Sequence, residues 1–364
     1  MNGRVLWIFL ALTGVFFMFG CVSKKADKQF TIQRGTNISH WLSQSGRRSA
    51  EREVFFGKKD VKFLAGLGFD HLRLPVDEEQ MWDESGNREA EAFKLLGSAL
   101  DWCAEYNLKA IVDLHILRSH HFNKAEKPLW TQPEAQEKFF DFWRDLSAFL
   151  KERPVNMVAY ELMNEPVADD PEDWNKLVEK AIQVVRENEP NRVLVIGSNR
   201  WQSVDTFDKL RIPENDKNIL LSFHMYTPLV FTHYKASWTK VGEFTGPVKY
   251  PGVIIDDKDL KGLADDLMKE ISYHNGDFNR DSFVKLIEKP LALAAKYNLP
   301  LYCGEWGCLP TVPEQGRMQW YRDVRSVLEE NGIAWATWDY KGSFGIKSRD
   351  GKEIFQNLID VLLK

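Results

Sequence analysis

Short apolar runs alternate with amphipathic stretches along most of this chain. Eight of the runs are rich in β-branched and aromatic residues, as buried strands usually are. They cover residues 30–38, 71–76, 109–115, 157–165, 192–198, 218–226, 300–307 and 333–340. Between most of them, apolar side chains recur every three or four positions, which predicts helices. One such stripe consists of Trp174, Leu177, Val178, Ala181, Ile182 and Val185.

The predicted helices end at residues that tolerate a left-handed backbone. Gly68, Asn107, Asn298 and Gly332 each stand shortly before a predicted strand, where a helix commonly ends on Gly or Asn. Strands that alternate with helices pair in parallel, through right-handed crossovers. An open doubly wound sheet and a closed (β/α)8 TIM barrel both satisfy this rule. Eight units, with no glycine-rich phosphate loop after the first strand, favour the α/β class and a TIM barrel.

The connection after the sixth run is too long for a single crossover helix. Residues 227–300, which are 74 residues, separate the sixth and seventh predicted strands. We therefore expect one catalytic barrel over residues 30–364, with an inserted subdomain at about 227–280.

The start of the chain predicts export. Residues 5–20 are uncharged and almost wholly apolar, and Arg4 precedes them, which is typical of a signal peptide. The run is short for a membrane span, which needs roughly 17–25 residues. Gly20 followed by Cys21 resembles a bacterial lipoprotein signal. We expect a signal over 1–20, a lipid on Cys21, a tether over 21–29 and a place in the cell envelope or outer membrane; plain secretion and a membrane anchor are the alternatives.

Composition narrows the class of partner. The net charge is −5 and the isoelectric point is near 6.0, so no basic surplus indicates nucleic acid. The remaining cysteines, Cys103, Cys303 and Cys308, are odd in number and lack zinc-site spacing, so we interpret them as small buried hydrophobes. We expect a monomer that touches a membrane only through its lipid.

Polar, ionisable or aromatic residues stand at the same end of several predicted strands. They are Arg73, His115, Asn164, Glu165, His224, Tyr226, Glu305 and Trp338. In a parallel barrel these ends meet on the face where active sites are built. Each residue alone has a structural explanation, but packing alone rarely produces the whole set. Alternation places Asp113 and Glu161 one layer deeper, where we expect them to pair with basic side chains.

Two carboxylates at one barrel mouth indicate glycoside hydrolysis without a cofactor. One acid would protonate the departing oxygen, and the other would meet the anomeric carbon. A metal site built from Asp113, His115, His120 and His121 lacks tight ligand spacing. A Ser-His-Asp site lacks the GxSxG elbow. We therefore expect no cofactor and no metal.

Several motifs together resemble glycoside hydrolase family 5, a family of retaining cellulase and mannanase barrels. They are NEP (164–166), HMY (224–226), GEWG (304–307), RLP (73–75) and DLH (113–115). Longer stretches, such as WLSQ at 41–44 and LYCGEWG at 301–307, are similar to the clostridial endoglucanase C branch. That branch also carries a subdomain after the sixth strand.

The resemblance implies roles for individual residues. Glu165 would be the general acid/base and Glu305 the nucleophile. Arg73 and Tyr226 would keep Glu305 ionised. Asn164 would bond the sugar hydroxyl next to the reacting carbon, and Trp338 would lie under the sugar. The other expected substrate-binding residues are Asn37, Trp41, His115, Trp130 and His224, with Trp41 and Trp130 as stacking platforms.

The expected activity is that of an endo-acting β-1,4-glucanase on a β-glucan polysaccharide or oligosaccharide. A β-mannanase, a xyloglucanase or another β-glucanase is the alternative within the family. A non-catalytic glycan-binding lipoprotein is the alternative of another class, although a pure binder needs no pair of glutamates. Ser39 and His40 stand where the endoglucanase C branch usually has two glycines. We expect His40 to narrow the near end of the cleft, which leaves the exact glycan open.

Overall fold

The computed structural model describes residues 29–364. The predicted signal and the lipid attachment at Cys21 lie outside these residues. Among the helices of the described part, none is both long and apolar enough to cross a bilayer. The three cysteines of this part are free and buried, in agreement with their interpretation as core residues.

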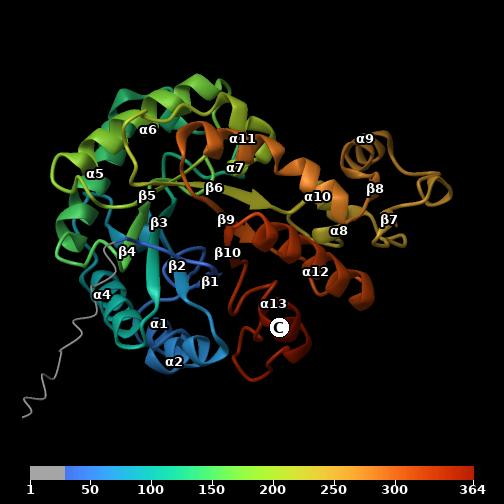
Figure 1. The fold of residues 1–364 in the computed structure, drawn as a ribbon, viewed down its shortest axis with the longest axis horizontal. Helices are drawn as coiled ribbons and strands as arrows, with labels where there is room; N and C mark the ends of the chain where they lie inside the picture. Colours follow the sequence, from blue (N-terminus) through green and yellow to red (C-terminus); the bar gives the residue numbers. More distant parts are fainter. Residues whose placement is uncertain (1–28) are drawn as a thin grey trace, which may run out of the picture.

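Eight parallel strands close into a barrel in the order β1-β2-β3-β4-β5-β6-β9-β10. They are Arg34–Asn37 (β1), His71–Asp77 (β2), Lys109–Ile116 (β3), Val158–Glu161 (β4), Leu194–Gly197 (β5), Ile219–Met225 (β6), Leu301–Trp306 (β9) and Ala334–Thr337 (β10). Figure 1 shows the strands at the centre and helices around them. The predicted TIM barrel is therefore confirmed, because β1 pairs with both β2 and β10.

The longer helices cover the outside of the barrel. They are Lys58–Leu67 (α2), Ala90–Glu105 (α4), Pro133–Leu150 (α5), Pro171–Arg186 (α6), Arg280–Leu286 (α10), Glu288–Tyr297 (α11), Glu314–Glu330 (α12) and Gln356–Leu363 (α13). The stripe predicted for α6 is buried along its whole length. The four predicted stops have φ of 100° at Gly68, 56° at Asn107, 50° at Asn298 and 67° at Gly332, so the left-handed helix ends are confirmed.

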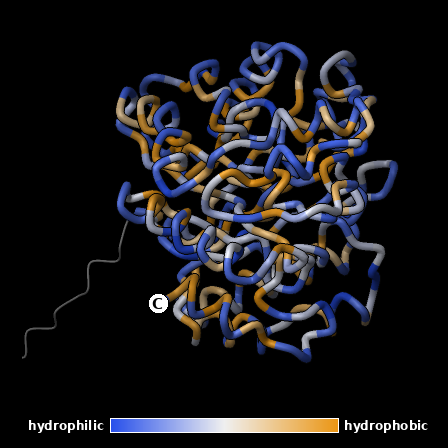
Figure 2. Tube along the Cα trace, turned by 90° about the vertical axis from the view of Figure 1, so that its right-hand side faces the viewer, coloured by the Kyte–Doolittle hydropathy of each residue, from blue (hydrophilic) through white to orange (hydrophobic). Residues whose placement is uncertain are grey.

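Short elements complete the connections on the barrel. They are Ala50–Phe55 (α1), Glu78–Met81 (α3), Asn199–Gln202 (α7) and the 3-10 turns Pro128–Trp130 (η1) and Val204–Lys209 (η2). Polar positions follow most of the outer loops in Figure 2, while apolar positions lie inside.

The segment inserted after β6, called the inserted unit below, forms several short elements beside the barrel, and most of its buried apolar residues join the large core cluster of the barrel. It contains Leu229–Thr232 (α8), Lys240–Glu243 (η3), Gly252–Val253 (β7), Asp257–Asp259 (η4), Asp265–His274 (α9) and Asp277–Phe278 (β8). Strands β7 and β8 pair antiparallel and are separate from the barrel. Figure 1 shows this unit beside the barrel, beyond α10. Its buried residues include Ile254, Ile255 and Ile271.

Alternation along the strands separates two kinds of core. Outward side chains pack under the helices in one large cluster, and inward side chains form a small plug inside the barrel. The plug comprises Phe30, Ile111, Ala159, Val195, Leu220, Tyr302 and Ala336. Because inward positions repeat every second residue, Asp113 and His115 follow Ile111 on the inner face. The site is thus built on the layers above the plug.

Candidate active site

Glu165 and Glu305 share one pocket over the barrel mouth. A carboxylate oxygen of each, together with one ring nitrogen of His224, lies within a group whose atoms are all at most 4.8 Å apart. Nδ1 of His224 is 2.8 Å from Glu165 and 3.7 Å from Glu305. Both carboxyl groups line the cleft, although their residues are only 8% and 5% exposed.

A β-bulge turns Glu305 into the barrel. Cys303 pairs with Phe223 on the outer face of the sheet, whereas Glu305 pairs with His224 on the inner face. Gly304 is the extra residue between them, and it interrupts the strict alternation by which Glu305, two residues after Cys303, would share the outward direction of Cys303. Residue 304 must also be small, because a Cβ there would lie 2.9 Å from Oγ of Ser222.

Arg73 is the central cation of the site. It is fully buried on β2, and its guanidinium contacts three carboxylates and two amides. They are Asp113 (3.0 Å), Glu161 (2.6 Å), Glu305 (2.8 Å), Asn37 (2.8 Å) and Asn164 (2.7 Å). The expectation that Asp113 and Glu161 pair with a base is confirmed. One arginine therefore holds the layer beneath Glu305 together.

Replacing Arg73 by Met should destabilise the fold strongly. The change leaves three buried carboxylates without their cation, and breaking a buried ion pair in this way typically costs about 3–5 kcal/mol. Urea unfolding measures the loss of free energy. Arg144, which is 45% exposed beside Glu137 and Asp141, is the control, and its replacement by Met should cost less than about 1 kcal/mol. Equal effects of the two changes would contradict the central role of Arg73.

The surroundings of Glu165 and Glu305 differ, and they favour different protonation states for the two carboxyl groups. Burial, and then the charge of Glu305, raises the pKa of Glu165 well above its ordinary value. Burial also raises the pKa of Glu305, but Arg73 and the hydroxyl of Tyr226 oppose that rise. The proton of the pair therefore resides on Glu165, and Glu305 stays ionised.

Two histidines beside the acids are neutral. Burial lowers the pKa of His115 to about 3 and that of His224 well below its ordinary value. His115 lies 2.7 Å from Asp113 and is parallel to the ring of Trp338, with 5.6 Å between ring centres. This stack holds Trp338 at the cleft, which it lines.

Tyr226 donates its hydroxyl proton to Glu305 over 2.9 Å. Replacing Tyr226 by Phe removes a donor that favours the charged carboxylate, so the pKa of Glu305 should rise. Activity needs Glu305 ionised, and it should therefore be lost at a higher pH when the solution is acidified. The pH profile of kcat/KM measures this shift of the acidic limb. If the acidic limb of the profile does not move in Tyr226→Phe, the proposed effect of the Tyr226 hydroxyl on Glu305 would be contradicted.

The cleft around the acids has a volume of about 1160 Å³. Its aromatic lining comes from both the barrel loops and the inserted unit, and consists of Phe122, Trp201, Tyr226, Trp238, Tyr273, Phe278, Trp338 and Phe344. Trp201, Trp238 and Tyr273 are 43%, 52% and 81% exposed. Flat exposed rings of this kind suit the apolar faces of sugars.

Three of the expected substrate contacts are placed elsewhere. Trp41 is 1% exposed and packs on Phe56, so its prediction as a platform is wrong. Asn37 is also buried and uses its amide on Arg73 and the carbonyls of Gly304 and Thr337, so it supports the site from below. Trp130 packs edge-on against His120 and is not among the residues that line the cleft.

The sequence interpretation missed several residues of the site. Gln44 lies 3.1 Å from Nε2 of His115. Gln202 is buried against Glu161, and Arg349 lines the cleft. Gln44 ends the WLSQ stretch, but that resemblance gave it no role, and Gln202 and Arg349 belong to no quoted motif. His40 does line the cleft, as expected, and its φ of 56° is one that Gly adopts more easily.

The residues weighed as metal ligands do not form one group. His120 donates from its ring to the backbone carbonyl of Glu165, while His115 faces Asp113. Within residues 29–364, the one group close enough to hold a metal is Glu165, His224 and Glu305. The raised pKa of Glu165 and the lowered pKa of His224, both caused first by burial, favour a protonated acid beside a neutral imidazole, which suits proton transfer.

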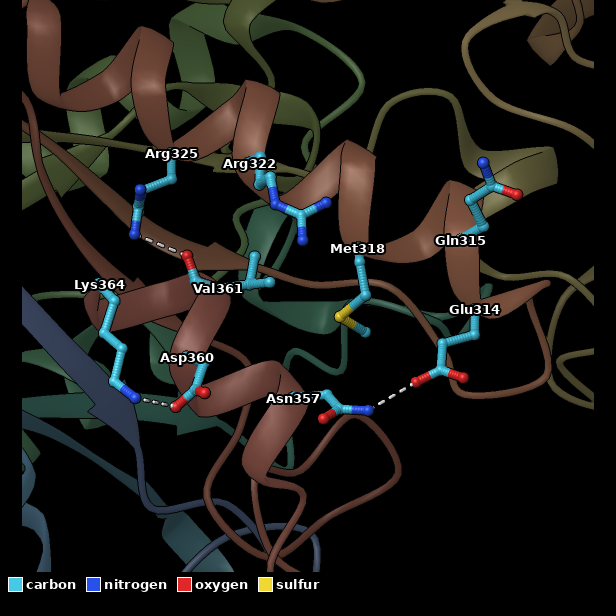
Figure 3. Close-up of a pocket in the computed structure, with 9 residues that line it drawn as sticks. All are labelled: Glu314, Gln315, Met318, Arg322, Arg325, Asn357, Asp360, Val361 and Lys364. Atoms are coloured by element: carbon cyan, nitrogen blue, oxygen red, sulfur yellow. Dashed lines mark hydrogen bonds and ion pairs between the residues drawn. The ribbon is translucent and has the colours of Figure 1, made fainter.

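A second cavity lies between α12 and α13 and has a volume of about 570 Å³. Figure 3 shows three contacts among the residues that line it. Lys364 pairs with Asp360, Asn357 donates to Glu314, and Arg325 donates to the carbonyl of Val361. None of these residues is among those that line the cleft around both acids.

A (β/α)8 barrel with a protonated and an ionised carboxyl group in one open cleft defines a glycoside hydrolase. The chain belongs to glycoside hydrolase family 5, since the family's model, Cellulase (glycosyl hydrolase family 5), matches residues 35–343. The chain is 32% identical over 349 residues to endoglucanase C of Acetivibrio thermocellus, which covers 92% of this chain and 98% of that protein. It is 27% identical to cellodextrinase A of Ruminococcus flavefaciens, over 83% and 84% of the two chains.

Solved structures share the fold at lower identity. Subunit Z of the clostridial cellulose synthase from Clostridioides difficile has a TM-score of 0.74 at 23% identity, over 92% of this chain and all of that one. A hyperthermophilic endo-β-1,4-glucanase has the same TM-score and identity, over 91% and 96%.

Proposed function

We propose that this protein is an endo-acting β-1,4-glucanase that retains the anomeric configuration. The observation that carries the proposal is the short distance, at most 4.8 Å, between oxygens of Glu165 and Glu305. Retaining enzymes need carboxyl groups about 5–5.5 Å apart, whereas inverting enzymes leave roughly 6.5–9.5 Å for a water.

The reaction then proceeds in two displacements. Ionised Glu305 attacks the anomeric carbon and forms a glycosyl ester, while Glu165 gives its proton to the departing glycosidic oxygen. In the second step Glu165, now a base, takes a proton from water. The water oxygen bonds to the anomeric carbon, and Glu305 leaves as a carboxylate. Both residues return to their starting states.

Asn164 offers a donor for the sugar. Its side-chain oxygen accepts from Arg73, and its buried Nδ2 has no partner in the described structure. Buried donors are rarely left unpaired, so a sugar hydroxyl beside the anomeric carbon is the acceptor we propose. Trp338 supplies the apolar face beneath that sugar.

The glucan specificity rests on the relatives that are named endoglucanase or cellodextrinase. The test is to incubate the protein with carboxymethylcellulose, lichenan, laminarin, xyloglucan and glucomannan, and to assay new reducing ends. We expect turnover on the β-1,4-glucans and a rapid fall in viscosity, because endo cleavage shortens chains early. Preference for mannan or xyloglucan would reassign the substrate, and no turnover on any polymer would favour a glycan-binding protein.

We also propose that the protein is exported and carries a lipid on Cys21, and that it acts as a monomer. The apolar run over residues 5–20 and the Gly20–Cys21 pair support the export part. Labelling of cells with radioactive palmitate tests it, with Cys21→Ser as the control. Label that persists in that variant would contradict the assignment.

A further inference from the structure

Three consecutive residues on the wall of the cleft have a left-handed backbone. Arg200, Trp201 and Gln202, at the end of α7, have φ of 57°, 60° and 53°. None is Gly, and each such residue costs on the order of 1 kcal/mol or more. Strained backbone persists only where its surroundings hold it, and it gathers at functional sites. The contacts made by α7 therefore indicate which part of the site needs this strained backbone.

Residues of α7 bind the chain on both sides of Glu165. The side chain of Asn199 exchanges two hydrogen bonds of 2.9 Å with the backbone of Ala168. The amide of Trp201 donates to the carbonyl of Pro166 over 3.3 Å. The segment after Glu165 is therefore held along its length by α7.

Gln202 makes the contact on the other side of Glu165. Its Nε2 donates to the backbone carbonyl of Asn164 and, over 2.8 Å, to Oε1 of Glu161. The side chain is fully buried. Gly197 leaves room for it, because a Cβ at that position would overlap the carboxamide. That carbonyl belongs to the peptide bond between Asn164 and Glu165, so its direction sets the direction of the Glu165 side chain.

We propose that Gln202 is a positioning residue for the general acid. By fixing the peptide plane before Glu165, it aims that carboxyl group at the glycosidic oxygen, while it touches neither substrate nor reacting atom. The inference rests on the proposed function of Glu165. A rival interpretation is that Gln202 only donates a hydrogen bond to Glu161, in which case its loss would disturb Arg73 and the nucleophile instead.

Leaving groups distinguish the two interpretations. Cellotetraose needs a proton on its departing oxygen, whereas 2,4-dinitrophenyl β-cellobioside loses a phenolate that needs none. In Gln202→Met, which keeps the length of the side chain and removes its donor, kcat/KM for cellotetraose should fall roughly 10- to 100-fold, as misplacement by about 1 Å does. For the dinitrophenyl substrate it should stay within about threefold. Equal losses on both substrates, or no loss on either, would overturn the proposal.

Rates are expressed per active site, counted with 2,4-dinitrophenyl 2-fluoro-β-cellobioside, which labels the nucleophile of folded enzyme. Asn175→Leu is the matched control, since Asn175 is a buried carboxamide on α6 that donates to the carbonyl of Lys209, and both substrates should be affected alike. Should Gln202→Met fail to fold, Gln202→Glu keeps the shape and donates only while protonated, so its discrimination between the substrates should grow more steeply with rising pH than that of the wild type. If the wild-type enzyme cleaves neither substrate, the proposed function fails and not the role of Gln202.

Discussion

Glu305→Gly is expected to lower kcat by at least roughly 10⁴-fold, because removal of a covalent nucleophile eliminates the first displacement. The missing side chain leaves space beside the anomeric carbon, so added azide should enter and restore cleavage of 2,4-dinitrophenyl β-cellobioside. Attack from the side of the lost carboxylate produces the α-glycosyl azide. Its configuration, read by NMR, reports which face the missing group occupied.

Glu314→Gly is the control for this change. Glu314 lies in the groove between α12 and α13 and is not among the residues that line the cleft, so kcat should stay near the wild-type value. A Glu305→Gly enzyme that keeps its activity, or one that azide leaves inactive, would remove the nucleophile assignment.

Glu165→Ala is expected to lower kcat/KM on cellotetraose by about 10²- to 10⁴-fold, the usual contribution of a general acid. The effect on 2,4-dinitrophenyl β-cellobioside should be small in the first step, since that leaving group departs without a proton. Hydrolysis of the glycosyl enzyme should become slow, because no base activates water.

Azide supplies the second readout for Glu165→Ala. It needs no base, so it should intercept the glycosyl enzyme and produce the β-glycosyl azide, opposite in configuration to the product of Glu305→Gly. Glu172→Ala, a change of a half-buried residue of α6 that pairs with Arg211, is the control and should leave both substrates unaffected. The same anomer from both variants would show that the two roles are assigned wrongly.

The barrel could be predicted because its signal is spread over many residues. Each strand is a short apolar run, each helix has its own stripe, and Gly68, Asn107, Asn298 and Gly332 mark the ends. Glu165 and Glu305 could be found because parallel strands bring their ends together. A local error of one or two residues changes neither conclusion.

The side-chain environment could not be predicted to the same depth. Trp41 follows the first strand by only a few residues, which suggested a place at the barrel mouth. Its ring packs instead against Phe56 and donates to the carbonyl of Arg52, and residue type alone does not reveal this burial. The position of the Gln202 side chain depends on three consecutive residues with a left-handed backbone, and none of them is a Gly that would mark this conformation in the sequence. Both depend on how loops fold, which tertiary contacts decide.

The direction of the nucleophile depends on the β-bulge at Gly304. Cys303 and Trp306 face the helices, and Glu305 turns inward only because one surplus residue interrupts their alternation. Regular pairing of β9 through residue 305, without the bulge, would send the carboxylate into the outer apolar layer, and no exchange of side chains could bring it back. The bulge in β9 is therefore under tighter constraint than the composition of the strand, and family members should differ in the residue types of this strand long before they lose the bulge.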